Sequence, residues 1–139
     1  MEERGHQHET QFEVRDYECD LQGVVNNAVY LHYLEHARHR WLESVGLDFA
    51  ALHAEGIDLV AVRIEIDYRR PLRSRDRFVV RSRLHRERRL RIVIDQEIRL
   101  LPAETEIARA RVVVACLQNG RPAAPAGVFG LFDRIVEEG

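Results

Sequence analysis

Lysine is absent from this 139-residue chain, so its fixed positive charge comes entirely from 21 arginines. An arginine cluster is therefore less informative here than elsewhere, because arginine fills every ordinary basic surface position. Cysteine is scarce too: Cys19 and Cys116 are the only two, and their separation fits no zinc or redox motif. We expect both thiols to be free, as in a reducing compartment. Cys19 precedes Asp20, so a nucleophilic role for Cys19 is an alternative. The spacing along the sequence suggests no histidine partner for it.

Long apolar runs are also missing. No run approaches the ~20 residues that a membrane span needs, and the charged N-terminus lacks the apolar core of a secretory signal. These absences predict a cytoplasmic protein without a membrane partner. The chain has 45% hydrophobic and 32% charged residues, which is typical of one soluble globular domain. We expect a flexible tail over residues 1–9 and a single domain over residues 10–139.

The formal net charge of −2 hides an uneven distribution along the sequence. Segment 63–91 holds 12 arginines against 4 acids, and the remainder of the chain holds 9 arginines against 19 acids. Such a basic segment can bind an anionic ligand such as a nucleotide phosphate. Nucleic acid is not an expected partner, because the arginines alternate with acids and lack interleaved exposed aromatic residues.

One long helix is predicted over residues 27–45. Its apolar side chains recur at steps of three and four and form one stripe: Tyr30, Tyr33, Leu34, Ala37, Trp41 and Val45. Asn26 suits the N-cap position, where its side chain would accept a hydrogen bond from the amide of Val29. Gly46 suits the left-handed residue after the last turn.

Elsewhere the hydrophobic period changes to two, which is typical of strands with one buried and one wetter face. A first short strand is expected at 11–17. Four longer strands follow, at 60–68, 77–84, 90–99 and 108–116. The buried face of the 60–68 strand is predicted to comprise Val60, Val62, Ile64, Ile66 and Tyr68. Turn residues end the later strands at 86–89, 101–104 and 119–120. The apolar residues of 129–136 predict a short closing helix or an extended cover.

One long helix with an antiparallel sheet indicates an α+β fold in which the sheet curls around the helix and buries its stripe. The first strand is expected at one side of the sheet. A generic α+β sandwich would show the same pattern. Because a single helix cannot cover a five-stranded sheet, we expect pairing with a second copy, as a homodimer or a dimer-based homotetramer.

The segment with the most chemistry is 20–30, with the sequence DLQGVVNNAVY. It places the carboxylate of Asp20 and a glycine turn at Gly23 before two asparagines that open the helix. Unpaired N–H groups and the positive dipole end at a helix start can stabilise an oxyanion. A carboxylate a few residues upstream can act beside it as a base or nucleophile. Each residue also has an ordinary structural role, Asp20 in a turn and Tyr30 in the core.

This segment, continued by YLEHAR at 33–38, resembles the hotdog-fold thioesterases of the 4-hydroxybenzoyl-CoA thioesterase type. A second motif is similar to the start of that family's third strand: YRRPL at 68–72, followed by Asp76. The resemblance extends from Phe12 to about Gly120. It implies the hotdog fold, an antiparallel sheet wrapped around one long central helix, and hydrolysis of a small or medium acyl-CoA.

The resemblance also implies roles for individual residues. Asp20 matches the catalytic carboxylate, and the amide of Asn27 falls where the family polarises the thioester carbonyl. The rest of the segment is assigned to substrate binding: Gly23, Val25, Asn26 and Tyr30. Arg88 and Arg89 match hairpin positions whose basic residues hold the CoA nucleotide, and Arg69 is a weaker candidate of the same type. No metal or redox cofactor is expected, and CoA enters only as part of the substrate.

Three alternatives accompany this hypothesis. The double asparagine also resembles acyl carrier protein thioesterases of the same fold, so a carrier protein is a second expected partner. A non-catalytic acyl-CoA binding or sensing module would keep the basic hairpin but would not need Asp20. A hotdog dehydratase would place a histidine near the helix start, whereas His32 lies well inside the helix. We interpret Glu35, on an apolar flank of the helix, as an ion-pair partner of Arg38 rather than an active-site residue.

Overall fold

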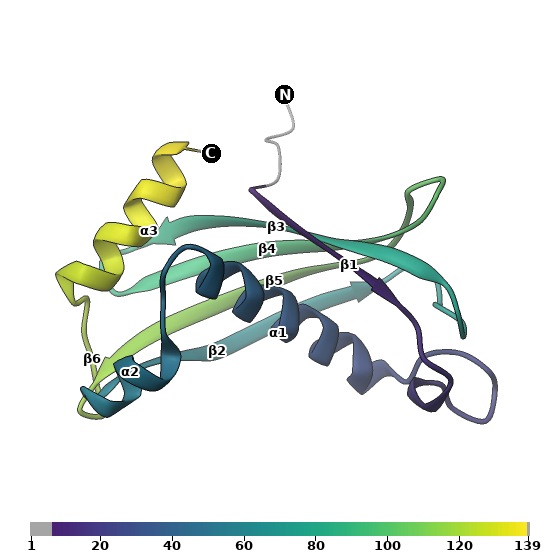
Figure 1. Ribbon diagram of the computed structural model, residues 1–139, viewed down its shortest axis with the longest axis horizontal. Coiled ribbons are helices and arrows are strands. Elements are labelled where there is room, and N and C mark those ends of the chain that lie inside the picture. Colours follow the sequence, from purple (N-terminus) through teal and green to yellow (C-terminus); the bar gives the residue numbers. More distant parts are fainter. Residues whose placement is uncertain (1–6, 139) are drawn as a thin grey trace.

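One antiparallel sheet wraps around the long helix α1 in the computed structural model, which describes residues 7–138 (Figure 1). The elements follow one another as β1 (His8–Glu13), the 3₁₀ turn η1 (Asp16–Glu18), α1 (Asn27–Ser44), α2 (Phe49–Ala54), β2 (Ile57–Tyr68), β3 (Arg77–Glu87), β4 (Arg91–Leu100), β5 (Thr105–Gln118), β6 (Arg121–Pro122) and α3 (Ala126–Glu138). The strand order is β1-β3-β4-β5-β2, with the short β6 pairing with β5. This is the predicted hotdog arrangement, with β1 at one edge of the sheet and β2 at the other.

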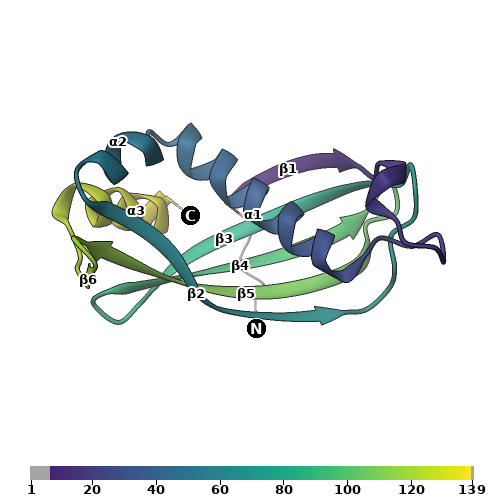
Figure 2. The same cartoon turned by 90° about the horizontal axis from the view of Figure 1, so that it is seen from below.

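The two ends of the molecule differ. Helices α2 and α3 lie at one end, beside the β3–β4 hairpin, and the loop that leads into α1 lies at the other (Figures 1 and 2). Helix α3 was expected either as a short helix or as an extended cover, and it is a 13-residue helix. The described residues include no helix with the length and apolar content needed to cross a membrane.

Helix α1 begins and ends almost where the periodicity predicts. Asn26 is the N-cap, but its side-chain oxygen accepts from the amide of Ala28 at 2.9 Å rather than from Val29. Gly46 has a φ of +103°, as expected for the left-handed residue after the helix. The predicted stripe is buried except for Val45, which is half-buried.

The first strand differs from its prediction. It covers His8–Glu13 rather than 11–17, because the chain turns at η1, where the carboxylate of Glu18 accepts from the amide of Arg15 at 2.7 Å. His8 and Glu9, assigned to the tail by the sequence, pair with β3 in this strand. Residues 1–6 of the predicted tail lie outside the described residues.

Strand β2 corrects the predicted burial of its apolar side chains. A register shift between Ala61 and Arg63 marks a bulge, so Val60 faces Ala115 of β5 whereas Ile64 faces Val112. Ala115 and Val112 are an odd number of residues apart, which places Val60 and Ile64 on opposite faces. Most of the predicted buried set is exposed at this edge: Val60, Val62, Ile64 and Tyr68.

A buried polar layer divides the core beneath α1 into two apolar clusters. Arg38, only 7% exposed, donates from Nη1 to the side-chain oxygen of Gln96 on β4 at 3.0 Å. The Gln96 amide donates in turn to the carbonyl of Leu34 and to the hydroxyl of Ser82, each at 3.1 Å. Burial lowers the pKa of Arg38, and the charge of Glu35 opposes that shift. Arg38 thus makes a hydrogen bond from helix to sheet, and the charge of its predicted partner Glu35 still favours its charged form.

The outer face of the sheet carries charges that alternate in sign from strand to strand. Two rows of facing residues share this pattern: Arg81, Glu97, Arg109 and Asp67, then Arg83, Asp95, Arg111 and Glu65. Ion pairs within the rows include Arg111 with Asp95 at 2.8 Å. Acids from other parts of the chain thus neutralise β3 arginines of the basic segment 63–91, as the pair of Arg81 with Glu9 at 3.1 Å shows.

Candidate active site at the start of the central helix

The candidate site begins with a tight loop that precedes α1. Cys19 and Val25 face each other in an isolated β-bridge, and the amide of Asp20 donates to the carbonyl of Val24 at 2.9 Å. The amide of Gly23 donates back to the carbonyl of Asp20 at 3.0 Å. Gly23 closes this turn with a φ of +79°, a conformation that favours glycine. The Asp20 side chain is thereby presented, exposed, on the loop that leads into α1.

The first turn of α1 offers a free donor. The Asn26 amide donates to the carbonyl of Glu18 at 3.1 Å, and its side chain caps Ala28. In the part of the chain that the structure describes, no acceptor pairs with the amide of Asn27. An unpaired N–H at the positive end of an 18-residue helix is a donor suited to an oxyanion.

The second sequence motif holds this helix start in place. The hydroxyl of Tyr68 donates to the carbonyl of Asn27 at 3.1 Å, and the amide of Leu72 donates to the hydroxyl of Tyr30 at 2.9 Å. Val25, in turn, donates from its amide to the carbonyl of Leu72 at 2.8 Å. Burial raises the pKa of Tyr30, which keeps its phenol neutral. Tyr30 and Val25, predicted to bind substrate, are buried and support the site from beneath.

Asp16, Glu18 and Asp20 occupy alternate positions of the chain leading to α1, and they differ in their hydrogen-bond partners. Asp16 accepts from the hydroxyl of Ser74, and Glu18 accepts from the Arg15 amide and from the hydroxyl of Tyr33. Asp20 accepts only from the amide of its neighbour Gln22, at 2.9 Å, among the described residues. Asp20 is thus the carboxylate that the fold leaves available to a ligand.

The same carboxylates argue against a nucleophilic Cys19. Burial is the largest cause that raises the pKa of its thiol, and the charges of Asp16, Asp20 and Glu18 add to the shift. A thiolate, the reactive form of cysteine, is therefore disfavoured at this position. Cys19 and Cys116 are both free, as the sequence predicts.

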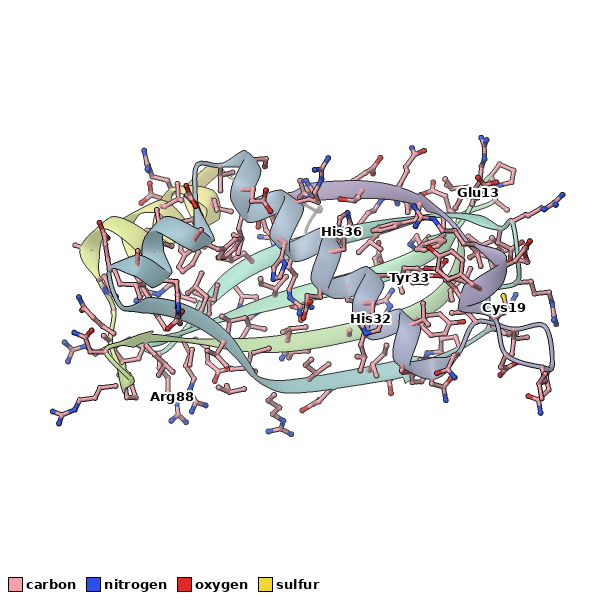
Figure 3. All side chains as sticks on the ribbon, turned by 60° about the horizontal axis from the view of Figure 1, so that its bottom comes forward. Glu13, Cys19, His32, Tyr33, His36 and Arg88 are labelled. Atoms are coloured by element: carbon pink, nitrogen blue, oxygen red, sulfur yellow. The ribbon has the colours of Figure 1, made fainter. Side chains whose placement is uncertain are left out.

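The candidate phosphate-binding arginines fall at opposite ends of the protomer. Arg69 follows β2 directly, and its amide donates to the carbonyl of Ile107 at 2.8 Å, on the same loop that holds the helix start. Arg88 and Arg89 are exposed in the β3–β4 hairpin, at the far end from Cys19 (Figure 3). Strand β3 has 11 residues, a length of roughly 36 Å at the usual rise per residue. One protomer therefore does not bring Arg88 and Arg89 to Asp20.

Sequence reasoning missed several residues that shape this site. Arg73 forms a bridge with Val24 of the Asp20 loop, and no ion pair involves its exposed side chain among the described residues. Glu18 also contacts the helix start without having been singled out, whereas Tyr68 was named only as part of the 68–72 motif and of its strand. The motif at 68–72 was the available signal for Tyr68 and its loop, whereas no pattern marked Glu18.

Comparison with known proteins identifies the class to which this fold and site belong. The model of the thioesterase-like superfamily matches residues 14–128, and the chain is a member of that family. The chain is 40% identical over 112 residues to a chloroplastic acyl-acyl carrier protein thioesterase of Arabidopsis thaliana, covering 81% of this chain and 59% of that protein. It is 36% identical over 109 residues to a long-chain acyl-CoA thioesterase of Escherichia coli, covering 78% of this chain and 82% of that protein.

Solved structures agree on the fold. A 1,4-dihydroxy-2-naphthoyl-CoA thioesterase from Synechocystis superposes with a TM-score of 0.86 at 22% identity, covering 94% of this chain and 96% of that one. At this identity the likeness shows the shared fold. The chain spans about three fifths of the length of the chloroplastic relatives that it matches.

Proposed function

We propose that this protein is a thioester hydrolase that cleaves acyl-CoA to a free acid and CoA. The proposal rests on two groups that the fold leaves available to a ligand near one helix start: the Asn27 amide, and the Asp20 carboxylate, which accepts only from the Gln22 amide among the described residues. Membership of the thioesterase-like superfamily supports the reaction class. The 40% identity to a carrier-protein thioesterase supports an acyl carrier protein as the second candidate substrate carrier.

The proposed chemistry follows from these two groups. A water oxygen, whose proton passes to the Asp20 carboxylate, or Asp20 itself, attacks the thioester carbonyl and produces a tetrahedral oxyanion. The Asn27 amide donates to that oxyanion, and one such donor contributes roughly 2.7–4 kcal/mol in other enzymes. The C–S bond then breaks, and the CoA thiolate leaves and takes up a proton. If Asp20 attacks directly, water hydrolyses the resulting mixed anhydride.

The experiment that tests this function measures release of free thiol from a panel of thioesters. The panel includes short, medium and long acyl-CoAs, an aromatic acyl-CoA and one acyl carrier protein thioester. Thiol release from at least one member supports the proposal, and the ranking tests the expected preference for small or medium acyl groups. Absence of release from the whole panel, with correctly folded protein, contradicts it.

The active unit that we propose is a dimer formed along β2. This 12-residue strand is a sheet edge, and apolar side chains on it or beside it are exposed: Leu31, Val60, Val62, Ile64 and Tyr68. A long apolar edge strand is a site where another chain can pair. A second copy pairing there would cover these side chains and bring a second sheet beside the Tyr68–Asn27 contact.

Placing a charge on this edge is expected to break the dimer. Ile64→Arg should convert the protein to a monomer at micromolar concentration and lower thioesterase activity at least 10-fold, because a buried unpaired guanidinium is strongly unfavourable. Light scattering after size exclusion measures the mass. Glu65→Gln, on the opposite face of the same strand, is the matched control and should stay dimeric. An Ile64→Arg protein that remains a dimer would place the interface elsewhere.

Pairing along β2 also explains how two separate arginine groups could serve one substrate. If the two β2 strands run antiparallel, the hairpin end of one protomer lies beside the helix-start end of the other. Arg88 and Arg89 of the partner would then approach the loop that holds Arg69 and Arg73. Exposed guanidinium groups without ion-pair partners in the described structure suit the CoA phosphates.

Removal of the hairpin charges is expected to weaken binding of the nucleotide part of the substrate. The double variant Arg88→Ala with Arg89→Ala should raise KM for acyl-CoA about 10-fold, which corresponds to about 1.4 kcal/mol. KM for the same acyl group on N-acetylcysteamine, which lacks phosphates, should be unchanged. The exposed Arg121, replaced by alanine, serves as the control. Equal changes in KM for both thioesters would exclude phosphate binding by the hairpin.

A further inference from the structure

Glu18 holds two parts of the helix start at once. Its main-chain carbonyl accepts from the amide of Asn26, the N-cap of α1, at 3.1 Å. Its carboxylate accepts from the hydroxyl of Tyr33, in the second turn of α1, at 2.9 Å. Glu18 lies two residues before Asp20, so both bonds fix the chain that carries the candidate catalytic carboxylate.

Tyr33 is a rigid anchor for this contact. Its side chain is 4% exposed and its ring lies 4.7 Å from Phe78 and 5.6 Å from Phe12, centroid to centroid. Burial raises the pKa of the phenol, and the hydrogen bond to Glu18 raises it further, so the hydroxyl stays a donor. Figure 3 shows Tyr33 beside α1, on the side of the helix toward Cys19.

The Glu18–Tyr33 hydrogen bond joins the segment before the helix to α1 itself, beside the apolar packing of Val25 and Cys19 against the same helix. The hydrogen bonds of the loop at Asp20, Gly23 and Val24 close the loop on itself. The hydrogen bond between Asp16 and Ser74 joins this segment to the loop between β2 and β3. Among the described residues, the bond from Tyr33 is the only side-chain hydrogen bond between segment 15–25 and α1.

From this geometry we propose that Glu18 is a positioning residue, which with Tyr33 sets the Asp20 carboxylate relative to the Asn27 amide. The effect on turnover rests on the proposed thioesterase function. A catalytic group displaced by about 1 Å can lose up to about 100-fold in rate. Substrate binding by distant groups, and so KM, would be little affected by such a displacement.

The test compares five variants with the wild-type protein. Glu18→Ala and Tyr33→Phe should each lower kcat about 10-fold with KM within about 2-fold. The double variant should lose no more than Glu18→Ala alone, because that change already removes the bond to Tyr33 together with the Arg15 contact. Glu18→Gln keeps an oxygen acceptor for Tyr33 and should recover most of kcat. Ser74→Ala, which removes the neighbouring Asp16 contact, should leave kcat unchanged. A rise in KM with unchanged kcat would overturn the proposal. So would a fall in kcat in the double variant equal to the product of the two single effects.

Amide hydrogen exchange separates this proposal from the proposed function. Exchange in residues 19–27 should accelerate in Tyr33→Phe and Glu18→Ala but not in Ser74→Ala, whether or not any thioester is hydrolysed. Tyr33→Phe removes a single oxygen and keeps the packed ring, so it provides the result if Glu18→Ala does not fold. Unchanged exchange in Tyr33→Phe would show that the bond does not hold the loop, and the positioning role would be rejected.

Discussion

Asp20→Asn is expected to lower kcat about 10²–10⁴-fold, the range that a positioned general base contributes. In activation free energy this is about 2.7–5.4 kcal/mol. The amide oxygen of asparagine can still accept from the Gln22 amide, a bond of 2.9 Å in the native loop, so the turn should persist. The loss would then come from the missing negative charge. The measurement is thiol release from the best acyl-CoA of the panel, under saturating substrate.

The matched control is Asp16→Asn, on the same segment. Asp16 already accepts from the Ser74 hydroxyl, and an asparagine oxygen can replace the carboxylate in that bond. This variant removes one negative charge near the site without touching Asp20, and its kcat should stay within about 3-fold of wild type. Equal kcat for wild type and Asp20→Asn would remove Asp20 from the mechanism. A loss of similar size in both variants would assign the effect to net charge.

The sequence predicts those parts of the fold that depend on local order. The three- and four-residue steps of α1 and the alternation in β3, β4 and β5 each arise within one element, and these elements form where they were expected. The bulge in β2 could not be predicted in this way. It depends on the register against β5, where Ala61 faces Val114 and Arg63 faces Val113. Apolar alternation therefore identified a strand correctly but placed Val60 on the wrong face.

In the candidate site too, residues close in sequence could be predicted and contacts between distant segments could not. Asp20, Gly23 and Asn27 are close in sequence, so their spacing with a helix start was sufficient to single them out. The Tyr33–Glu18 bond joins residues 15 apart, and the Tyr68–Asn27 bond joins residues 41 apart. Such contacts arise only when the sheet brings distant segments together. The roles of Asp20 and Asn27 themselves stay predictions until turnover is measured.

The basic segment 63–91 shows why a count of charges alone does not identify an anion-binding surface. Its balance suggested one anion-binding surface, but strand pairing places Arg81 against Glu9 and Glu97. The arginines in the two loops, at 69–75 and 88–89, include the exposed Arg69, Arg88 and Arg89. An arginine that faces an acid across the sheet is already paired. Only the arginines without such a neighbour could therefore be proposed to bind phosphate.

Helix α3 leads to the largest expected change in stability. It lies almost wholly beyond residue 128, where the match to the family model ends. Phe132 is fully buried in the core cluster beneath α2 and α3, with its ring 5.3 Å from that of Phe129. Arg86 of β3 also holds the helix. Its Nη1 forms an ion pair with Oδ1 of Asp133 at 2.7 Å, and its guanidinium carbon lies 4.7 Å from the centroid of the Phe129 ring.

Phe132→Ala is therefore expected to lower the free energy of unfolding by about 3–5 kcal/mol, as for other buried phenylalanines. Urea denaturation at a fixed protein concentration measures this, because the apparent stability of the proposed dimer would depend on concentration. Arg134→Ala, at an exposed position of the same helix, should stay within about 0.5 kcal/mol of wild type. Since α3 lies at the end of the sheet away from the Asp20 loop, kcat of the folded variant should change less than about 3-fold. A loss below about 1 kcal/mol would mean that α3 unfolds separately, because an independent helix would withdraw Phe132 from the cooperative core without destabilising it.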